Sequence, residues 1–135
     1  MKFAIFVCFL GVLSFAAAGS IEGKSKEEKE EIIKKFYKCI ACSPNDQARA
    51  DYAECCKKKP KRITEISEEC KTGILANPED IQSRWTQICE SDEILTKVYS
   101  CIDEKLSANP ITEAEQEEGK PYKLCLMEMN EKYCL

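Results

Sequence analysis

The residues with the greatest potential for chemistry in this 135-residue chain are its ten cysteines, two of which form a Cys-x-x-Cys motif at Cys39 and Cys42. This spacing occurs in redox active sites and in halves of zinc sites. A reactive thiol of this kind lies at the start of a helix, where the helix dipole lowers its pKa, whereas the sequence places this pair at the end of a predicted helix. We therefore interpret both cysteines as partners in structural disulfides, and we expect neither a metal site nor another cofactor.

The chain contains no histidine, which excludes Ser-His-Asp and Cys-His catalysis and any histidine-ligated zinc site. Cys55-Cys56 resembles the first two residues of the Cys-Cys-x-x-His-Asp signature of secreted phospholipase A2. Lys59 and Pro60 occupy the histidine and aspartate positions of that signature, so the resemblance implies no activity. We expect no catalytic residue and no enzymatic function.

The first eighteen residues have the features of a secretory signal peptide. Lys2 supplies a positive charge, the apolar run 3–15 is too short to span a bilayer, and the alanines at 16–18 form a small-residue cleavage site. Cleavage after Ala18 leaves residues 19–135 as one cysteine-rich helical domain in an oxidising compartment. The sequence therefore predicts a secreted, extracellular protein.

All cysteines beyond the predicted cleavage point are disulfide candidates: Cys39, Cys42, Cys55, Cys56, Cys70, Cys89, Cys101, Cys125 and Cys134. Because their number is odd, one of them is either a free thiol or links two chains into a disulfide-linked homodimer. If Ser43 marks the turn between two antiparallel helices, the rise of each helix keeps Cys39 away from Cys55 and Cys56. We expect Cys39 or Cys42 to reach a helix distant in sequence, and Cys125 and Cys134 to bond different partners.

Apolar residues recur at helical spacing through nearly the whole mature chain, and no run alternates in the manner of a strand. Ser25 and Glu28 form a capping box for the first helix, and Ser91 caps another. Three further helices are predicted to start at a small polar residue followed by proline, at Ser43-Pro44, Asn77-Pro78 and Asn109-Pro110. The expected fold is all-α, a single disulfide-cross-linked bundle of five or six short helices, with 111–120 as a short acidic helix that runs into a loop.

One strongly basic cluster stands out in a chain with 20 basic and 24 acidic residues, and it consists of Lys57, Lys58, Lys59, Lys61 and Arg62. The net charge of −4 gives the molecule no general attraction to nucleic acid. Three interpretations of the cluster stay open: a solvated loop, a docking site for an anionic partner such as a glycosaminoglycan, phospholipid or channel vestibule, and a proteolytic processing site before Ile63.

Two functions from different classes follow from these features. The first is a non-enzymatic, toxin-like binding or effector protein of venom, saliva or body fluid that acts on an extracellular protein or membrane target through the basic cluster. The second is ligand carriage, because the signal peptide, the acidic balance, about six helices and the Cys125-x8-Cys134 spacing resemble arthropod odorant-binding proteins. That resemblance implies an apolar cavity for a small hydrophobic ligand, lined by Phe36, Tyr52, Trp85 and Met129. The hallmark Cys-x3-Cys of those carriers is missing here, and we favour the first function.

Overall fold

A computed structural model of the chain describes residues 5–6, 9–10 and 25–135. The helices of this part are α2 (Lys26–Cys42), α3 (Asp46–Cys56), α4 (Lys61–Ile74), α5 (Ile81–Glu90), α6 (Asp92–Ala108), α7 (Glu113–Glu118) and α8 (Lys120–Tyr133). The predicted all-α, disulfide-cross-linked bundle is confirmed. The described part has seven helices, one more than the upper end of the expected range. The acidic segment predicted as a short helix that runs into a loop is the helix α7, and only Gly119 separates it from α8.

Two short strands accompany the helices. β1 (Ile5–Phe6) and β2 (Phe9–Leu10) pair antiparallel, with Ile5 opposite Leu10, and both contact α4. These four residues lie within the predicted signal peptide. The rest of that peptide and its cleavage point after Ala18 lie outside the described residues.

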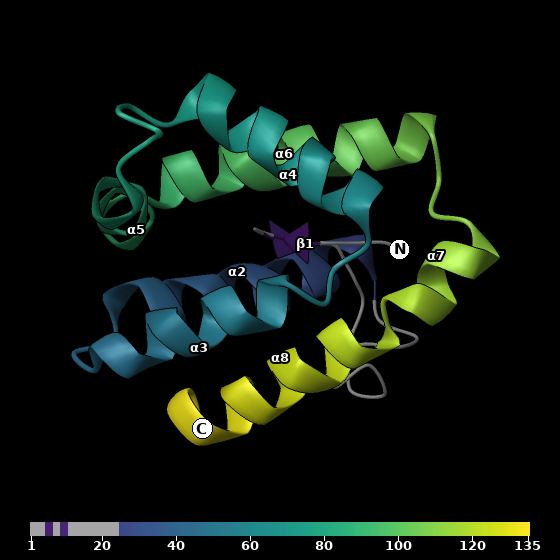
Figure 1. Ribbon diagram of the computed structural model, residues 1–135. Helices are drawn as coiled ribbons and strands as arrows, with labels where there is room; N and C mark the ends of the chain where they lie inside the picture. Colours follow the sequence, from purple (N-terminus) through teal and green to yellow (C-terminus); the bar gives the residue numbers. More distant parts are fainter. Residues whose placement is uncertain (1–4, 7–8, 11–24) are drawn as a thin grey trace.

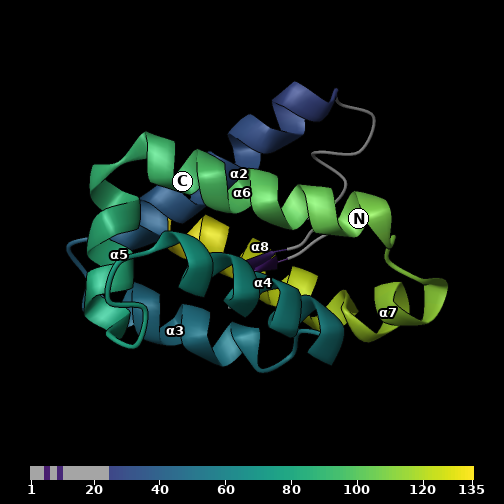
Figure 2. The same cartoon turned by 90° about the horizontal axis from the view of Figure 1, so that it is seen from above.

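The helices are arranged in two layers joined at their ends. Helix α4 packs on α6 in one layer, α3 packs on α8 in the other, and α2 contacts α3 and α8 (Figure 1). Helix α5 closes one end of the molecule by packing against α2 and α6, while α7 lies at the opposite end (Figure 2). None of the helices in the described part is both long and apolar enough to cross a membrane.

The helix starts that were predicted at proline dipeptides are wrong by a few residues. The observed N-caps are Asn45 for α3, Asp80 for α5 and Thr112 for α7, each with a side-chain oxygen that accepts a backbone N–H. The proline therefore lies outside each helix, one residue before the N-cap at Asn45 and two residues before it at Asp80 and Thr112. The capping box at Ser25 and the N-cap at Ser91, where no proline intervenes, are confirmed.

Disulfides connect helices that are far apart in the sequence. The described pairs are Cys39–Cys134, Cys42–Cys89, Cys55–Cys125 and Cys70–Cys101, with separations of 95, 47, 70 and 31 residues. As the helix geometry predicts, Cys39 and Cys42 reach distant helices, and Cys125 and Cys134 bond different partners. Cys56 is disulfide-bonded as well, so no described cysteine is the expected free thiol.

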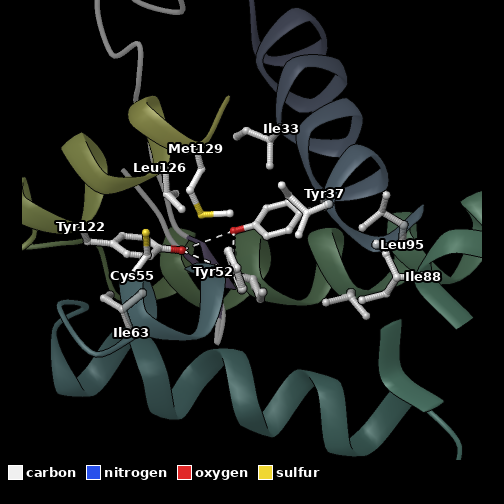
Figure 3. Packing of buried hydrophobic residues seen from close by; sticks show 14 of the residues in the cluster. Ile33, Tyr37, Tyr52, Cys55, Ile63, Ile88, Leu95, Tyr122, Leu126 and Met129 are labelled. Atoms are coloured by element: carbon white, nitrogen blue, oxygen red, sulfur yellow. Dashed lines mark hydrogen bonds between the residues drawn. The ribbon is translucent and has the colours of Figure 1, made fainter. Parts of the chain in front are cut away.

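Three tyrosines form a hydrogen-bonded cluster at the centre of the core. The hydroxyl of Tyr52 donates to that of Tyr37 over 3.1 Å, and the Tyr122 hydroxyl lies 3.3 Å from the Tyr37 oxygen (Figure 3). Burial raises the pKa of each of the three phenols well above the ordinary value for tyrosine. All three therefore stay neutral, and their hydroxyls can both donate and accept hydrogen bonds. Since these residues come from α2, α3 and α8, the cluster fixes the relative positions of three helices.

Candidate functional site

The predicted basic cluster lies at the connection between α3 and α4. The connection begins as a tight turn, in which the amide of Lys58 donates to the carbonyl of Cys55 over 3.0 Å and that of Lys59 to Cys56 over 3.1 Å. Pro60 then takes the N-cap position of α4, where it contributes no side-chain hydrogen bond. The Cys55–Cys125 disulfide attaches the end of α3 to α8. The loop is therefore anchored where it leaves α3.

Lys59 is folded into the interior and is only 7% exposed. Its ammonium donates to the hydroxyl of Ser67 over 3.3 Å and lies 5.4 Å from the centre of the Tyr122 ring, within the range of a cation–π interaction. A side chain in this position stabilises the packing of the loop on α4 and α8. It is not accessible to a partner.

Arg62 is also held by the protein itself. Its guanidinium forms a two-pronged ion pair with the carboxylate of Glu115, at 2.7 Å and 2.8 Å, and donates to the carbonyl of Asn109 over 3.0 Å. The same side chain donates to the carbonyl of Pro110. These contacts tie the start of α4 to the segment around α7, which identifies Arg62 as a structural residue.

The remaining members of the cluster, Lys57, Lys58 and Lys61, are exposed. We call these three residues the basic surface. Lys57 pairs with Glu54 over 2.9 Å, but both side chains are 70% exposed, and such a pair contributes little to stability. The structure thus divides the five predicted residues into two that hold the fold and three that are available for contact.

Replacing Arg62 by methionine is expected to lower the free energy of unfolding by about 2 kcal/mol at pH 7, because the half-buried Glu115 carboxylate loses its charged donors. The Arg62 guanidinium holds the pKa of Glu115 below its ordinary value. Since the folded pKa is depressed, this stabilisation is complete above the unfolded value of about 4.3 and is lost as the pH falls through the folded pKa. Denaturant unfolding of the wild type and Arg62→Met at pH 7 and pH 3 measures both effects.

The matched control for this prediction is Lys57→Met. It removes a cation from an exposed ion pair in the loop before α4, and is expected to change stability by less than about 1 kcal/mol. A stability difference between wild type and Arg62→Met that is the same at both pH values would show that the Glu115 ion pair is not its cause.

The four residues proposed to line a carrier cavity do not surround one space. Tyr52 and Trp85 are in edge-to-face contact, with ring centres 5.4 Å apart, and both line a half-open groove of about 330 Å³ between α3 and α5. Met129 is buried in the core, and Phe36 packs on Tyr37. Neither of them lines the groove.

The groove combines an apolar lining with cationic side chains. Besides Tyr52 and Trp85 its lining includes Ala50, Ala53, Cys56, Ile81, Gln82 and Ile88, together with the charged residues Asp46, Arg49, Lys71 and Arg84. Lys71 is only 6% exposed, and burial together with the neighbouring Arg84 lowers its pKa well below the ordinary value. We refer to this feature as the α3–α5 groove.

Both arginines of the groove also hold local structure. Arg49 donates to the carbonyls of Ile40 and Ser43 over 3.0 Å and 2.9 Å, and so caps the end of α2, while it pairs with Asp46. Arg84 binds the carboxylate of Glu68 through two hydrogen bonds, at 2.9 Å and 3.0 Å. The walls of the groove are therefore fixed by ion pairs from α3, α4 and α5.

Sequence reasoning missed the tyrosine cluster, the burial of Lys59 and Lys71, and the groove. The three tyrosines do lie on the apolar stripes of their predicted helices, which is a signal for burial, but nothing in the spacing shows that their hydroxyls meet. Within residues 25–135 and the two strands, no group of His, Cys, Asp or Glu side chains could hold a metal ion.

Comparison with known proteins gives one family match. The matching family is described as "Hi1a-like: U10-hexatoxin-Hi1a". Its model covers residues 26–135 of this chain. Among curated proteins, U10-hexatoxin-Hi1a of Hadronyche infensa is 36% identical over 109 residues, which cover 80% of this chain and 83% of that protein. No solved structure matches significantly.

Proposed function

Because the chain belongs to the Hi1a-like family and is a toxin-like, disulfide-rich helical protein, we propose that it is a secreted, non-enzymatic effector that binds an extracellular protein or a membrane of its target cell. The contact is made by the basic surface of Lys57, Lys58 and Lys61. The single observation that supports this assignment is the exposure of these three lysines where α3 connects to α4, beside two cations that the fold uses itself.

The basic surface has the physical properties of an electrostatic docking site. Three cations within five residues create a local positive field on a protein of net charge −4, and such a field steers association with an anionic partner. The turn that presents them is attached to α8 through Cys55 and Cys125, so that little conformational entropy is lost on binding.

The absence of catalysis is supported by the chemistry of the side chains. The sequence has no histidine, and the buried tyrosines are neutral phenols engaged with one another. Carriage of a ligand inside the bundle is not favoured, because the matched relative is named a toxin and because Phe36 and Met129 lie away from the space that Tyr52 and Trp85 line.

Charge reversal at the basic surface tests the proposal. The variant Lys57→Glu, Lys58→Glu, Lys61→Glu is expected to weaken binding on the order of 100-fold, since each lysine near an anionic surface contributes about 1 kcal/mol. The measurement is saturable binding of fluorescently labelled protein to cultured cells and, separately, to phosphatidylserine-containing vesicles, at low and high salt. Binding of the wild type should weaken as salt rises.

A second triple variant, Lys35→Glu, Lys97→Glu, Lys120→Glu, gives the matched control. It changes the net charge by the same amount at exposed positions, and its Lys120 forms an exposed ion pair with Glu117 as Lys57 does with Glu54. This control should bind like the wild type. The proposal is contradicted if both triple variants lose binding affinity equally. It is also contradicted if the wild type shows no saturable binding to either cells or vesicles. Binding to vesicles alone identifies a membrane as the target.

A further inference from the structure

The α3–α5 groove runs beside the whole length of α3 and ends next to the basic surface. Its lining extends along that helix from Asp46 to Cys56, and Lys57 follows as the C-cap with helical backbone angles. Ala53, an exposed residue of the lining, lies four residues before Lys57, so the two side chains are neighbours on one face of the helix. The groove and the basic surface are therefore parts of one continuous surface.

The groove offers apolar contact rather than charge. Arg49 of its lining is paired with Asp46. Arg84 binds the carboxylate of Glu68 through two hydrogen bonds. Burial and the neighbouring Arg84 lower the pKa of Lys71, which favours the neutral amine. The lining thus has no excess of positive charge, and an uncharged group is its suitable occupant.

The size and the lining of the groove suit an aromatic side chain of a partner. Its volume of about 330 Å³ lies at the lower end of the range for ligand pockets, roughly 300–1,000 Å³. Tyr52 and Trp85 supply an aromatic wall in edge-to-face contact, and Ile81 of the lining is 59% exposed. Aromatic anchors that fill such pockets contribute much of the binding energy of protein interfaces.

A hollow of this kind favours a protein over a lipid bilayer as the partner. Helices that bind a bilayer surface bury a protruding apolar face among the lipids. In this molecule the apolar residues beside the basic surface line a concavity instead. Cations next to an uncharged aromatic pocket match a peptide segment that combines carboxylates with one aromatic residue.

We propose that the target of the basic surface is a protein with an exposed acidic segment that carries one aromatic side chain. The carboxylates of this segment bind Lys57, Lys58 and Lys61. The aromatic side chain enters the α3–α5 groove and packs on Trp85 and Ile81. This inference rests on the proposed function, because it names the partner of the same basic surface.

Trp85 reports on the groove directly, because it is the only tryptophan in the chain and lies in the lining. The probes are the peptide Phe-Gly-Glu-Glu-Glu and its reversed-order isomer, titrated into the folded, oxidised protein at low salt. The glycine sets the phenylalanine two residues from the first carboxylate, about 7 Å of extended chain, which spans the helical turn between Ala53 and Lys57.

The control peptides carry alanine in place of phenylalanine. Trp85 fluorescence and isothermal titration calorimetry are recorded for all four peptides. We expect saturable binding of at least one phenylalanine peptide, and about tenfold weaker binding of its alanine counterpart.

Three variants separate the groove from the basic surface. Ile81→Ser removes an apolar wall, and Ala53→Gln fills the groove from an exposed position. Each should weaken binding of the phenylalanine peptide several-fold and leave the alanine peptide unchanged, whereas the charge-reversal triple variant of the basic surface should weaken both peptides equally. Ile32→Ser, at a partly exposed isoleucine of α2 outside the lining, is the matched control and should bind both peptides like the wild type.

The proposal is overturned by equal affinity for the phenylalanine and alanine peptides, or by a preference for phenylalanine that survives both Ile81→Ser and Ala53→Gln. Binding of the protein to phosphatidylserine vesicles but not to cells also overturns it, since the target is then a bilayer. Circular dichroism of each variant separates loss of the groove from loss of the fold.

The failure of this inference and the failure of the proposed function are distinguishable. If charge reversal leaves the binding to cells and vesicles unchanged, the proposed function itself fails. If charge reversal abolishes that binding and the peptides show no preference for phenylalanine, only the role of the groove is rejected.

Discussion

Replacing Cys39 and Cys134 together by alanine lowers the free energy of unfolding by about 4–5 kcal/mol. This disulfide spans 95 residues, the largest separation among the described pairs, and therefore restricts the unfolded chain most. It also ties the end of α2 to the C-terminal end of α8. Urea unfolding of the oxidised proteins measures the loss, which corresponds to a fall in melting temperature of about 15–25 °C.

The comparison variant is Cys70→Ala, Cys101→Ala, which opens the described bridge with the shortest separation, 31 residues. Its expected cost is about 3.5 kcal/mol, since the entropy of loop closure grows only slowly with length. An equal or larger loss in this variant would mean that local packing between α4 and α6, rather than the length of the closed loop, sets the contribution of the bridge.

Much of the fold is predictable from the sequence because it depends on local chemistry. The stripe of apolar residues along each helix and the caps at Ser25 and Ser91 are determined by neighbours within one or two turns. The helix starts near Pro44, Pro78 and Pro110 were predicted too early for an equally local reason. A side-chain oxygen nearer the helix, on Asn45, Asp80 or Thr112, is the better acceptor.

The division of the basic cluster was not predictable, because it depends on contacts between residues far apart in the chain. Lys59 packs over the ring of Tyr122, which comes from α8. Arg62 finds its carboxylate 53 residues later in Glu115 and a carbonyl 47 residues later in Asn109. In the sequence these two cations are indistinguishable from Lys57, Lys58 and Lys61.

The α3–α5 groove was not predictable either, because it also depends on contacts between residues far apart in the chain. It requires α5 to lie across the end of the bundle, where the Cys42–Cys89 disulfide holds it to α2. The sequence marks Tyr52 and Trp85 as members of apolar stripes, which is equally typical of a closed core. Their position beside a half-open space and beside Lys71 is a property of the assembled helices.

We expect that the disulfides, rather than the apolar core alone, hold the helices in this arrangement. Each bridge contributes several kcal/mol by restricting the unfolded chain, and the total stability of a domain is only about 5–15 kcal/mol. Removing all of them at once therefore leaves too little stability for a folded state at ordinary temperature, even though their effects are not strictly additive.

Far-UV circular dichroism of the secreted protein, recorded during thermal unfolding with and without strong reductant, tests this claim most directly. Thiol counting verifies that reduction is complete. We expect a cooperative transition for the oxidised protein, and loss of both that transition and most of the helical signal at 25 °C for the reduced one. A fully reduced protein that keeps its helical signal and the same melting temperature would contradict the account.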